Sequence, residues 1–294
     1  MHNAKIYQYF GSKFRLANQL TSALPHDRIY IEPFMGSASI YLNRSIDAKN
    51  ILCDQDITIT NMWRVVADKE KREEFKELFL QTPVDNLIFK RCLGEEMEGT
   101  KSDVERAVMT YYILVYSFDG NRKNMRYGSK PEKWNSMHEK ARRDLQANWD
   151  TWCCHAEKAK IITDNALNVI ARYKDCEEAV MMLDPPYVKE LLGKYCKDLY
   201  RSKFSDSEQH ELLALIRDAK AKILLCGYRG ETYLYDQYLN SASGWHCYCV
   251  NDRLNKACRT APKKGFAQEY IWVNYELPKE CRYYFSTFDL ALGA

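Results

Sequence analysis

The chain has 294 residues, of which 46% are hydrophobic and 28% are charged, and its formal net charge is +3. This composition excludes an intrinsically disordered protein, and the lack of any run of about 18 apolar residues excludes a helical membrane protein. Because Met1 to Tyr9 contain no apolar stretch of the signal-peptide kind, we expect a cytoplasmic protein with reduced thiols.

The eleven cysteines raise the question of a metal site. The cluster Cys153-Cys154-His155 and the pair Cys247 and Cys249 contain residue types that bind zinc. Neither group supplies two pairs of ligands at the spacing of a zinc finger. We therefore predict mostly buried thiols, with no metal and no disulfide framework.

The first strand is expected over Arg28 to Phe34, followed by a glycine turn and a helix that begins with Ser37 to Asn43. A second short strand, Asn50 to Cys53, ends at Asp54, which lies 22 residues beyond Glu32. An acid about 20 residues after a glycine-rich turn binds ribose hydroxyls in Rossmann-like units. In isolation this signal is weak, because Gly36 stands alone and no G-x-G-x-x-G is present.

Helical periodicity then replaces the α/β alternation over residues 65–150, as in the spacing of Val104, Val108 and Tyr111. Within this region, residues 120–143 contain eight cations and two anions, with Tyr127 and Trp134 interleaved. Such a mixture suits contacts with DNA phosphates and a few bases. A solvated helix face explains the same charge run equally well.

After a third strand, Lys160 to Thr163, the apolar run Ala179 to Leu183 indicates a buried parallel strand that ends at Asp184-Pro185-Pro186-Tyr187. Open α/β sheets bind ligands at such strand ends. The Asp184 carboxylate and the rigidly held Pro185 carbonyl can each accept one N–H of an exocyclic base amine, while Tyr187 offers a stacking face. On its own, the tetrapeptide fits an ordinary turn about equally well.

The remaining elements complete an α/β pattern. Ser205 to Glu208 form a capping box that opens an amphipathic helix, and Lys222 to Cys226 give another buried strand. Trp245 to Val250 and Tyr270 to Tyr275 are expected to form a closing antiparallel pair.

Taken in order, these motifs resemble the Dam-type (D12 class, group alpha) family of DNA adenine-N6 methyltransferases. The resemblance rests on Tyr9 to Lys13, Glu32 to Ser37, Asp54, Asp164 with Asn165, Asp184 to Tyr187, Phe204-Ser205 and Glu269 to Tyr275. It implies a Rossmann-like S-adenosylmethionine-dependent sheet (residues 1–64 and 151–294) with an inserted, mainly helical target-recognition domain (residues 65–150).

The resemblance also assigns roles to residues. The catalytic residues would be Asp184, Pro185, Pro186 and Tyr187. The S-adenosyl-L-methionine site would consist of Tyr9, Gly11, Lys13, Glu32, Pro33, Phe34, Gly36, Ser37, Asp54, Asp164, Asn165 and Asp184. The DNA contacts would come from Arg122, Lys123, Arg126, Tyr127, Lys130, Lys189 and Lys194.

Two departures from the family pattern affect what can be transferred. Ala38 replaces the second glycine of the cofactor turn, which narrows the room for close backbone approach. The recognition hairpin is reduced to the segment from Phe118 to Gly128, so the family's target sequence does not carry over.

The expected activity is site-specific methyl transfer to the N6 amine of an adenine flipped out of double-stranded DNA. The protein would act as a monomer or weak dimer, with or without a cognate restriction enzyme, and without a membrane or metal. Two alternatives remain. The first has the same fold but methylates cytosine N4 or RNA, and the second binds DNA without catalytic activity.

Several site residues have a structural alternative as well. Asp54 and Asp164 each precede an expected helix and are candidates for its N-cap. Lys13 is equally compatible with the surface, and Phe34 with the core.

Overall fold

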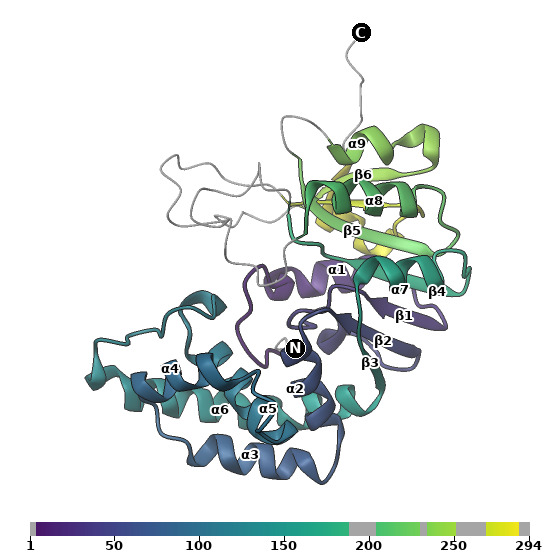
Figure 1. The fold of residues 1–294 in the computed structure, drawn as a ribbon. Coiled ribbons are helices and arrows are strands. Elements are labelled where there is room, and N and C mark those ends of the chain that lie inside the picture. Colours follow the sequence, from purple (N-terminus) through teal and green to yellow (C-terminus); the bar gives the residue numbers. More distant parts are fainter. Residues whose placement is uncertain (1–3, 188–203, 230–233, 251–268, 288–294) are drawn as a thin grey trace.

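An eight-stranded sheet forms the centre of the computed structural model, which describes residues 4–187, 204–229, 234–250 and 269–287 (Figure 1). The strand order is β3-β2-β1-β4-β5-β7-β6-β8, with parallel pairing from β3 to β5 and antiparallel pairing beyond β5. The strands are β1 (Ile29–Glu32), β2 (Lys49–Asp54), β3 (Ala159–Thr163), β4 (Ala179–Leu183), β5 (Lys222–Tyr228), β6 (His246–Val250), β7 (Glu269–Val273) and β8 (Phe285–Thr287).

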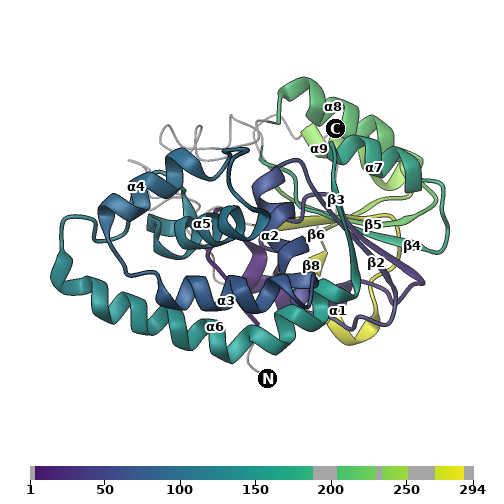
Figure 2. The same cartoon turned by 60° about the horizontal axis from the view of Figure 1, so that its bottom comes forward.

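The helices fall into two groups, one on the faces of the sheet and one beside it (Figure 2). Those on the faces are α1 (Ala17–Ala23), α7 (Ala166–Tyr173), α8 (Asp206–Arg217) and α9 (Leu234–Tyr238). Between β2 and β3 the chain forms a helical block of α2 (Ile57–Ala67), α3 (Lys71–Gln81), α4 (Asn86–Glu95), α5 (Asp103–Tyr116) and α6 (Trp134–Glu157). Among the described residues, no helix is both long and apolar enough to cross a bilayer.

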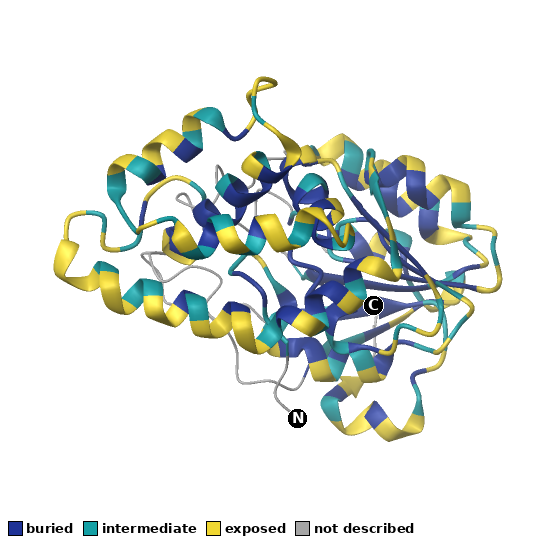
Figure 3. Ribbon diagram, turned by 90° about the horizontal axis from the view of Figure 1, so that it is seen from below, coloured by how far each residue is buried: buried dark blue, intermediate teal, exposed yellow. Residues whose placement is uncertain are grey.

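Two apolar cores lie on opposite faces of the sheet, and the buried residues follow the strands in Figure 3. Every residue of β4 is buried, as expected for a strand covered on both faces. Successive side chains alternate between faces, so Val180 and Met182 join the core shared with the helical block, while Met181 and Leu183 pack with α7 and α8. The predicted α/β class is confirmed.

The turn after β1 differs from the prediction. We expected a helix from Ser37, but the chain forms only a 3₁₀ turn at Tyr41–Asn43. Gly36 and Ala38 have φ values of 44° and 47°, and such left-handed residues cannot begin a right-handed helix. Ala38 therefore keeps the backbone conformation that a glycine would adopt without strain.

The closing antiparallel pair is confirmed, since β6 and β7 pair with His246 opposite Val273. The strand β8, which pairs with β6, was not predicted. It has only three residues, two of them exposed, so it carries too little hydrophobic pattern to be detected.

The segment after α5 packs against the chain's N-terminal segment. Gly120 has a φ of 67°, and a Cβ atom placed on it would lie 2.5 Å from the carbonyl oxygen of Gln8. Gln8 also donates a hydrogen bond to Asp119 and accepts one from Arg126. Gly120 is therefore required by a close backbone approach between two segments that are distant in sequence.

Replacing this glycine tests that approach. Gly120→Ala should lower the free energy of unfolding by about 2 kcal/mol, because the added methyl group meets both a left-handed backbone and a fixed carbonyl. Gly94→Ala is the matched control: Gly94 lies in α4 with open space around it, so the substitution should stabilise by about 0.5–1 kcal/mol. Urea unfolding of the two variants measures both effects, and equal midpoints would contradict the close approach.

Candidate active site

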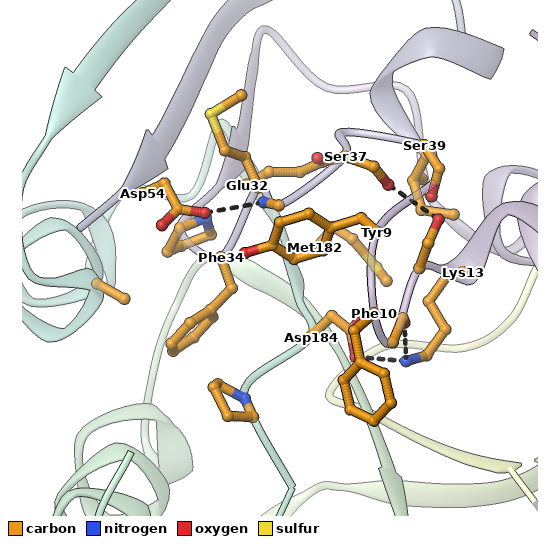
Figure 4. Close-up of a pocket in the computed structure, with 18 of the residues that line it drawn as sticks. Tyr9, Phe10, Lys13, Glu32, Phe34, Ser37, Ser39, Asp54, Met182 and Asp184 are labelled. Atoms are coloured by element: carbon orange, nitrogen blue, oxygen red, sulfur yellow. Dashed lines mark hydrogen bonds and ion pairs between the residues drawn. The ribbon is translucent and has the colours of Figure 1, made fainter. Parts of the chain in front are cut away.

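A cleft opens at the carboxyl ends of β1 and β4, where the strand order of the parallel sheet reverses direction (Figure 4). Of the predicted cofactor residues, all but Asp164 line it. Sequence reasoning assigned no cofactor role to several other lining residues, namely Phe10, Ser12, Met35, Ser39, Ile40, Gln55, Ala166, Met182 and Phe204. Met182 could have been found from the sequence, because alternate residues of a strand share a face and Met182 is two residues before Asp184.

Asp54 fixes the glycine turn that forms one wall of the cleft. Its carboxylate accepts hydrogen bonds from the backbone N–H groups of Gly36, at 3.0 Å, and Asp56, at 2.9 Å. Burial raises the pKa of Asp54 to about 6, against the opposing effect of these bonds. The alternative role of Asp54 as a helix cap is wrong, since Asp56 caps α2 by accepting from the Thr58 N–H.

The Tyr9 ring lies directly against the turn (Figure 4). A Cβ atom on Gly36 would be 2.9 Å from Tyr9 Cε1. The ring and the turn therefore form a continuous surface, with Phe34 on another wall of the cleft. Phe34 packs edge-on against Phe204, with ring centroids 5.4 Å apart.

The sequence left open whether Asp164 caps α7 or contacts the cofactor, and the structure shows that Asn165 is the cap. The Asn165 side chain caps α7 by accepting from the Leu167 N–H, and Asn165 also lines the cleft. Asp164 is therefore not the N-cap. Its carboxylate accepts from the Asn168 side chain and the Asn165 N–H, and these two bonds lower its pKa.

The tetrapeptide after β4 carries a buried ion cluster. Lys13 Nζ lies 2.6 Å from Asp184 Oδ1 and 3.7 Å from Glu269 Oε1, and Glu269 begins β7 (Figure 4 shows the first pair). The Tyr187 hydroxyl donates to Glu269 Oε1 at 2.8 Å, and the Tyr187 ring packs against Tyr228. Lys13 also lies 4.7 Å from the centre of the Tyr187 ring. A surface position for Lys13 is therefore wrong.

Burial controls the ionisation of this cluster. It raises the pKa of Asp184, and it raises the pKa of Glu269 to about 7, while Lys13 acts in the opposite direction on both carboxyls. For Lys13, burial favours the neutral amine. The carboxylates of Asp184 and Glu269 more than offset that effect and hold the Lys13 pKa well above its ordinary value.

A buried glutamine fixes the other end of the tetrapeptide. Gln209 of α8 is fully buried, and its Nε2 donates to the Pro186 carbonyl at 2.6 Å. The Tyr235 hydroxyl in turn donates to Gln209 Oε1. Sequence reasoning found α8 from its capping box but gave no signal for this contact, because Gln209 follows Pro186 by 23 residues.

The predicted DNA-contacting residues separate into exposed and buried groups. Lys123, Tyr127 and Lys130 are exposed and gather with Lys90 and Asn86 of α4 around a second hollow. Arg126 is partly exposed. Lys189 and Lys194 lie outside the described residues.

The position of Arg122 differs from the prediction that this residue contacts DNA. Its side chain is only 9% exposed, and its guanidinium lies 2.7 Å from Asp56 Oδ2 and 2.7 Å from Glu96 Oε2. It also donates to Thr58 Oγ1. The guanidinium is thus turned into the protein and joins the segment after α5 to the start of α2.

Within the part of the chain that the structure describes, no three His, Cys, Asp or Glu side chains are arranged to hold a metal ion. Cys153 and Cys247 are buried, and burial raises the pKa of the Cys153 thiol to about 11 and that of Cys247 to about 12.

Comparison with known proteins agrees with the geometry. The family model of the D12 class N6 adenine-specific DNA methyltransferases matches residues 9–243, from the N-terminal wall of the cleft to beyond α9. The chain is similar to the DNA adenine methylase of Serratia marcescens, with 26% identity over 223 residues, which cover 72% of this chain and 77% of that protein.

A second relative gives the same result over a similar span. The DNA adenine methylase of Salmonella typhi is 25% identical over 219 residues, which cover 71% of this chain and 74% of that protein. The DNA adenine methylase of Escherichia coli (strain K12) is 25% identical over a shorter match of 123 residues, which cover 40% of this chain and 42% of that protein.

The ion cluster predicts a pH-dependent loss of stability when its cation is removed. Lys13→Met should lower the free energy of unfolding by about 3 kcal/mol at pH 8, because two buried carboxyls lose their counter-ion. In the variant these carboxyls keep their protons to higher pH than in the unfolded chain, so the loss grows as pH rises from 5 to 8. Urea unfolding at several pH values measures this trend.

Lys140→Met is the control. Lys140 forms an exposed ion pair with Asp144, worth under about 1 kcal/mol. If Lys13→Met lowers the free energy of unfolding no more than Lys140→Met does, and by the same amount at every pH, the cluster is not buried.

Proposed function

The chain belongs to the family of D12 class N6 adenine-specific DNA methyltransferases, and on that premise we propose how its own residues carry out the reaction. The protein methylates adenine in DNA and uses a methyl donor. We propose S-adenosyl-L-methionine as that donor, bound in the cleft at the ends of β1 and β4. The observation that carries the proposal is the placement of Asp184 on the same cleft as Asp54 and the glycine turn.

The cleft has the features that this donor requires. A ribose needs a carboxylate at the end of β2, which Asp54 supplies, and a sulfonium is attracted to aromatic faces, which Tyr9 and Phe34 supply. Asn165, which lines the cleft, would contact the edge of the bound adenine ring, whereas Asp164 would need to reach in from beside the cleft. When bound, the donor supplies an electrophilic methyl group.

The acceptor amine must be made nucleophilic by the protein. An adenine amine is a poor nucleophile because its lone pair is delocalised into the ring. Asp184 and the Pro185 carbonyl accept its two N–H groups and so localise that pair and aim it. The Tyr187 ring, held by Glu269 and Tyr228, is 6% exposed and has Lys13 over it, so the flipped base would stack on it once the ammonium moves aside.

DNA would reach this site through the helical block. We propose that residues 65–150 form the target-recognition domain and that residues 1–64 and 151–294 form the catalytic domain. Lys123, Arg126, Tyr127 and Lys130 would contact DNA, joined by Lys90 across the second hollow. Because one chain carries both the donor cleft and this cationic surface, we propose that it acts as a monomer.

The alternatives with another acceptor have less support. Methylation of cytosine N4 or of RNA disagrees with the matched family, which is adenine-specific. A non-catalytic relic would have no need to keep Asp184 and Lys13 as a buried ion pair.

Methyl transfer into defined DNA tests the proposal directly. The protein with labelled S-adenosylmethionine should label adenine in duplex DNA, and Asp184→Ala should abolish transfer because the amine loses its acceptor, while donor binding persists. Nucleoside analysis and a donor-binding titration provide the two measurements. Label in cytosine, or near-normal turnover of Asp184→Ala, would refute the assignment.

The proposed DNA surface predicts a change in salt dependence. Lys123→Ala combined with Lys130→Ala should reduce the slope of log K against log salt by about two, because two DNA phosphates are no longer neutralised by the protein. Lys220→Ala is the control, because Lys220 is exposed just before the amino end of β5, away from the cleft. An unchanged slope in the double variant would remove these lysines from the interface.

A further inference from the structure

The Lys13 ammonium lies between two carboxylates, one just after β4, with a side chain 23% exposed, and one buried at the start of β7. Asp184 Oδ1 is 2.6 Å away and Glu269 Oε1 is 3.7 Å away, with the Gly11 carbonyl oxygen at 3.4 Å. The Lys13 side chain is 7% exposed and that of Glu269 is 8% exposed. Asp184 belongs to the proposed catalytic tetrapeptide, whereas Glu269 has been assigned only the hydrogen bond that holds Tyr187.

The close Lys13–Asp184 pair conflicts with the role proposed for Asp184. A carboxylate that is already bonded to an ammonium accepts an amine N–H less strongly. It also offsets less of the positive charge that develops on the amine nitrogen as the new C–N bond forms. For Asp184 to act at full charge, the ammonium must move away from it.

Lys13 cannot leave Asp184 for an apolar environment, because a buried charge without a partner is strongly unfavourable. Glu269 Oε1 is the second carboxylate oxygen that the structure places beside the ammonium. It is held in place by the Tyr187 hydroxyl and by its position in β7, where Glu269 pairs with Tyr228 of β5. A small rotation of the lysine stem would bring the ammonium to it.

We propose that Glu269 is a positioning residue for methyl transfer, which receives the Lys13 ammonium when the substrate amine reaches Asp184. This inference rests on the proposed function. Above the pKa of Glu269 no proton moves in the exchange: Lys13 stays protonated, and both carboxyls are ionised. The positive charge of a sulfonium donor, added to that of Lys13, offsets the charges of Asp184 and Glu269.

Because Glu269 must be ionised to receive the ammonium, the exchange should make kcat depend on pH. The titratable groups that face Glu269 are Lys13, Asp184, Tyr187, Cys226, Tyr228 and Tyr235. Burial raises the pKa of Glu269 to about 7. A protonated Glu269 cannot hold an ammonium, so kcat should fall as pH decreases through this range.

The test is Glu269→Gln, which keeps the size of the side chain and an oxygen that accepts from Tyr187 but removes the charge. We expect kcat to fall on the order of a hundredfold, because Lys13 stays on Asp184 and the amine is misplaced. Donor affinity should stay within about twofold, and the change of kcat with pH near 7 should disappear. Unfolding curves confirm that the variant is folded.

Two further variants separate this role from a structural one. Tyr187→Phe removes the hydroxyl bond to Glu269 but leaves its charge, so it should keep the pH dependence that Glu269→Gln loses. In a Lys13→Met background no ammonium needs a second partner, so adding Glu269→Gln should cause little further loss of kcat.

The outcomes distinguish this inference from the proposed function. If the unaltered protein fails to methylate adenine, the function itself is wrong. If it methylates adenine and Glu269→Gln has normal kcat, or the two substitutions have additive effects, Glu269 does not receive the Lys13 ammonium.

Discussion

The active site depends on an ion cluster that is costly to bury. Lys13, Asp184 and Glu269 come from the N-terminal segment, the end of β4 and the start of β7, so their attraction draws together three distant parts of the chain. Replacing such a cluster with apolar side chains is often neutral or stabilising in other proteins. Its presence beside the catalytic tetrapeptide is therefore better explained by chemistry than by stability. On the proposal above, these charges also determine when Asp184 can act.

The wall opposite this cluster is held by backbone conformation rather than by charge pairing. The turn after β1 places Gly36 and Ala38 in left-handed conformations, and Asp54 accepts the Gly36 N–H. Ala38 is fully buried, so its methyl group contributes packing, which offsets a strain of about 1–2 kcal/mol for a non-glycine residue at such a φ. The alanine that stands where the family has its second glycine thus adopts a backbone conformation typical of glycine.

The sequence predicted the elements that have strong local patterns. The buried strands and the capping box at Ser205 followed from local apolar runs and capping patterns. Most cleft-lining residues followed from the resemblance of short motifs to those of the family. Contacts between distant residues were beyond such reasoning. Arg122 was interpreted as part of a cationic surface, yet its partners Asp56 and Glu96 are 66 and 26 residues away in the sequence. Gln209 and Glu269 act on the tetrapeptide across similar separations, which no local pattern records.

If the segment after α5 contacts DNA as proposed, Arg122 has a consequence for how target preference can change in this protein. The segment that carries Lys123 and Tyr127 is anchored by Arg122 to Asp56, whose N–H is bonded to Asp54 in the donor cleft. On its other side, Gly120 rests on the backbone next to Tyr9. Grafting a foreign specificity loop here would take the guanidinium away from the two carboxylates beneath the graft. On the proposed function, a chimaera would therefore need to import the arginine and the glycine together with the base-reading side chains, or disturb the proposed donor cleft along with its old target.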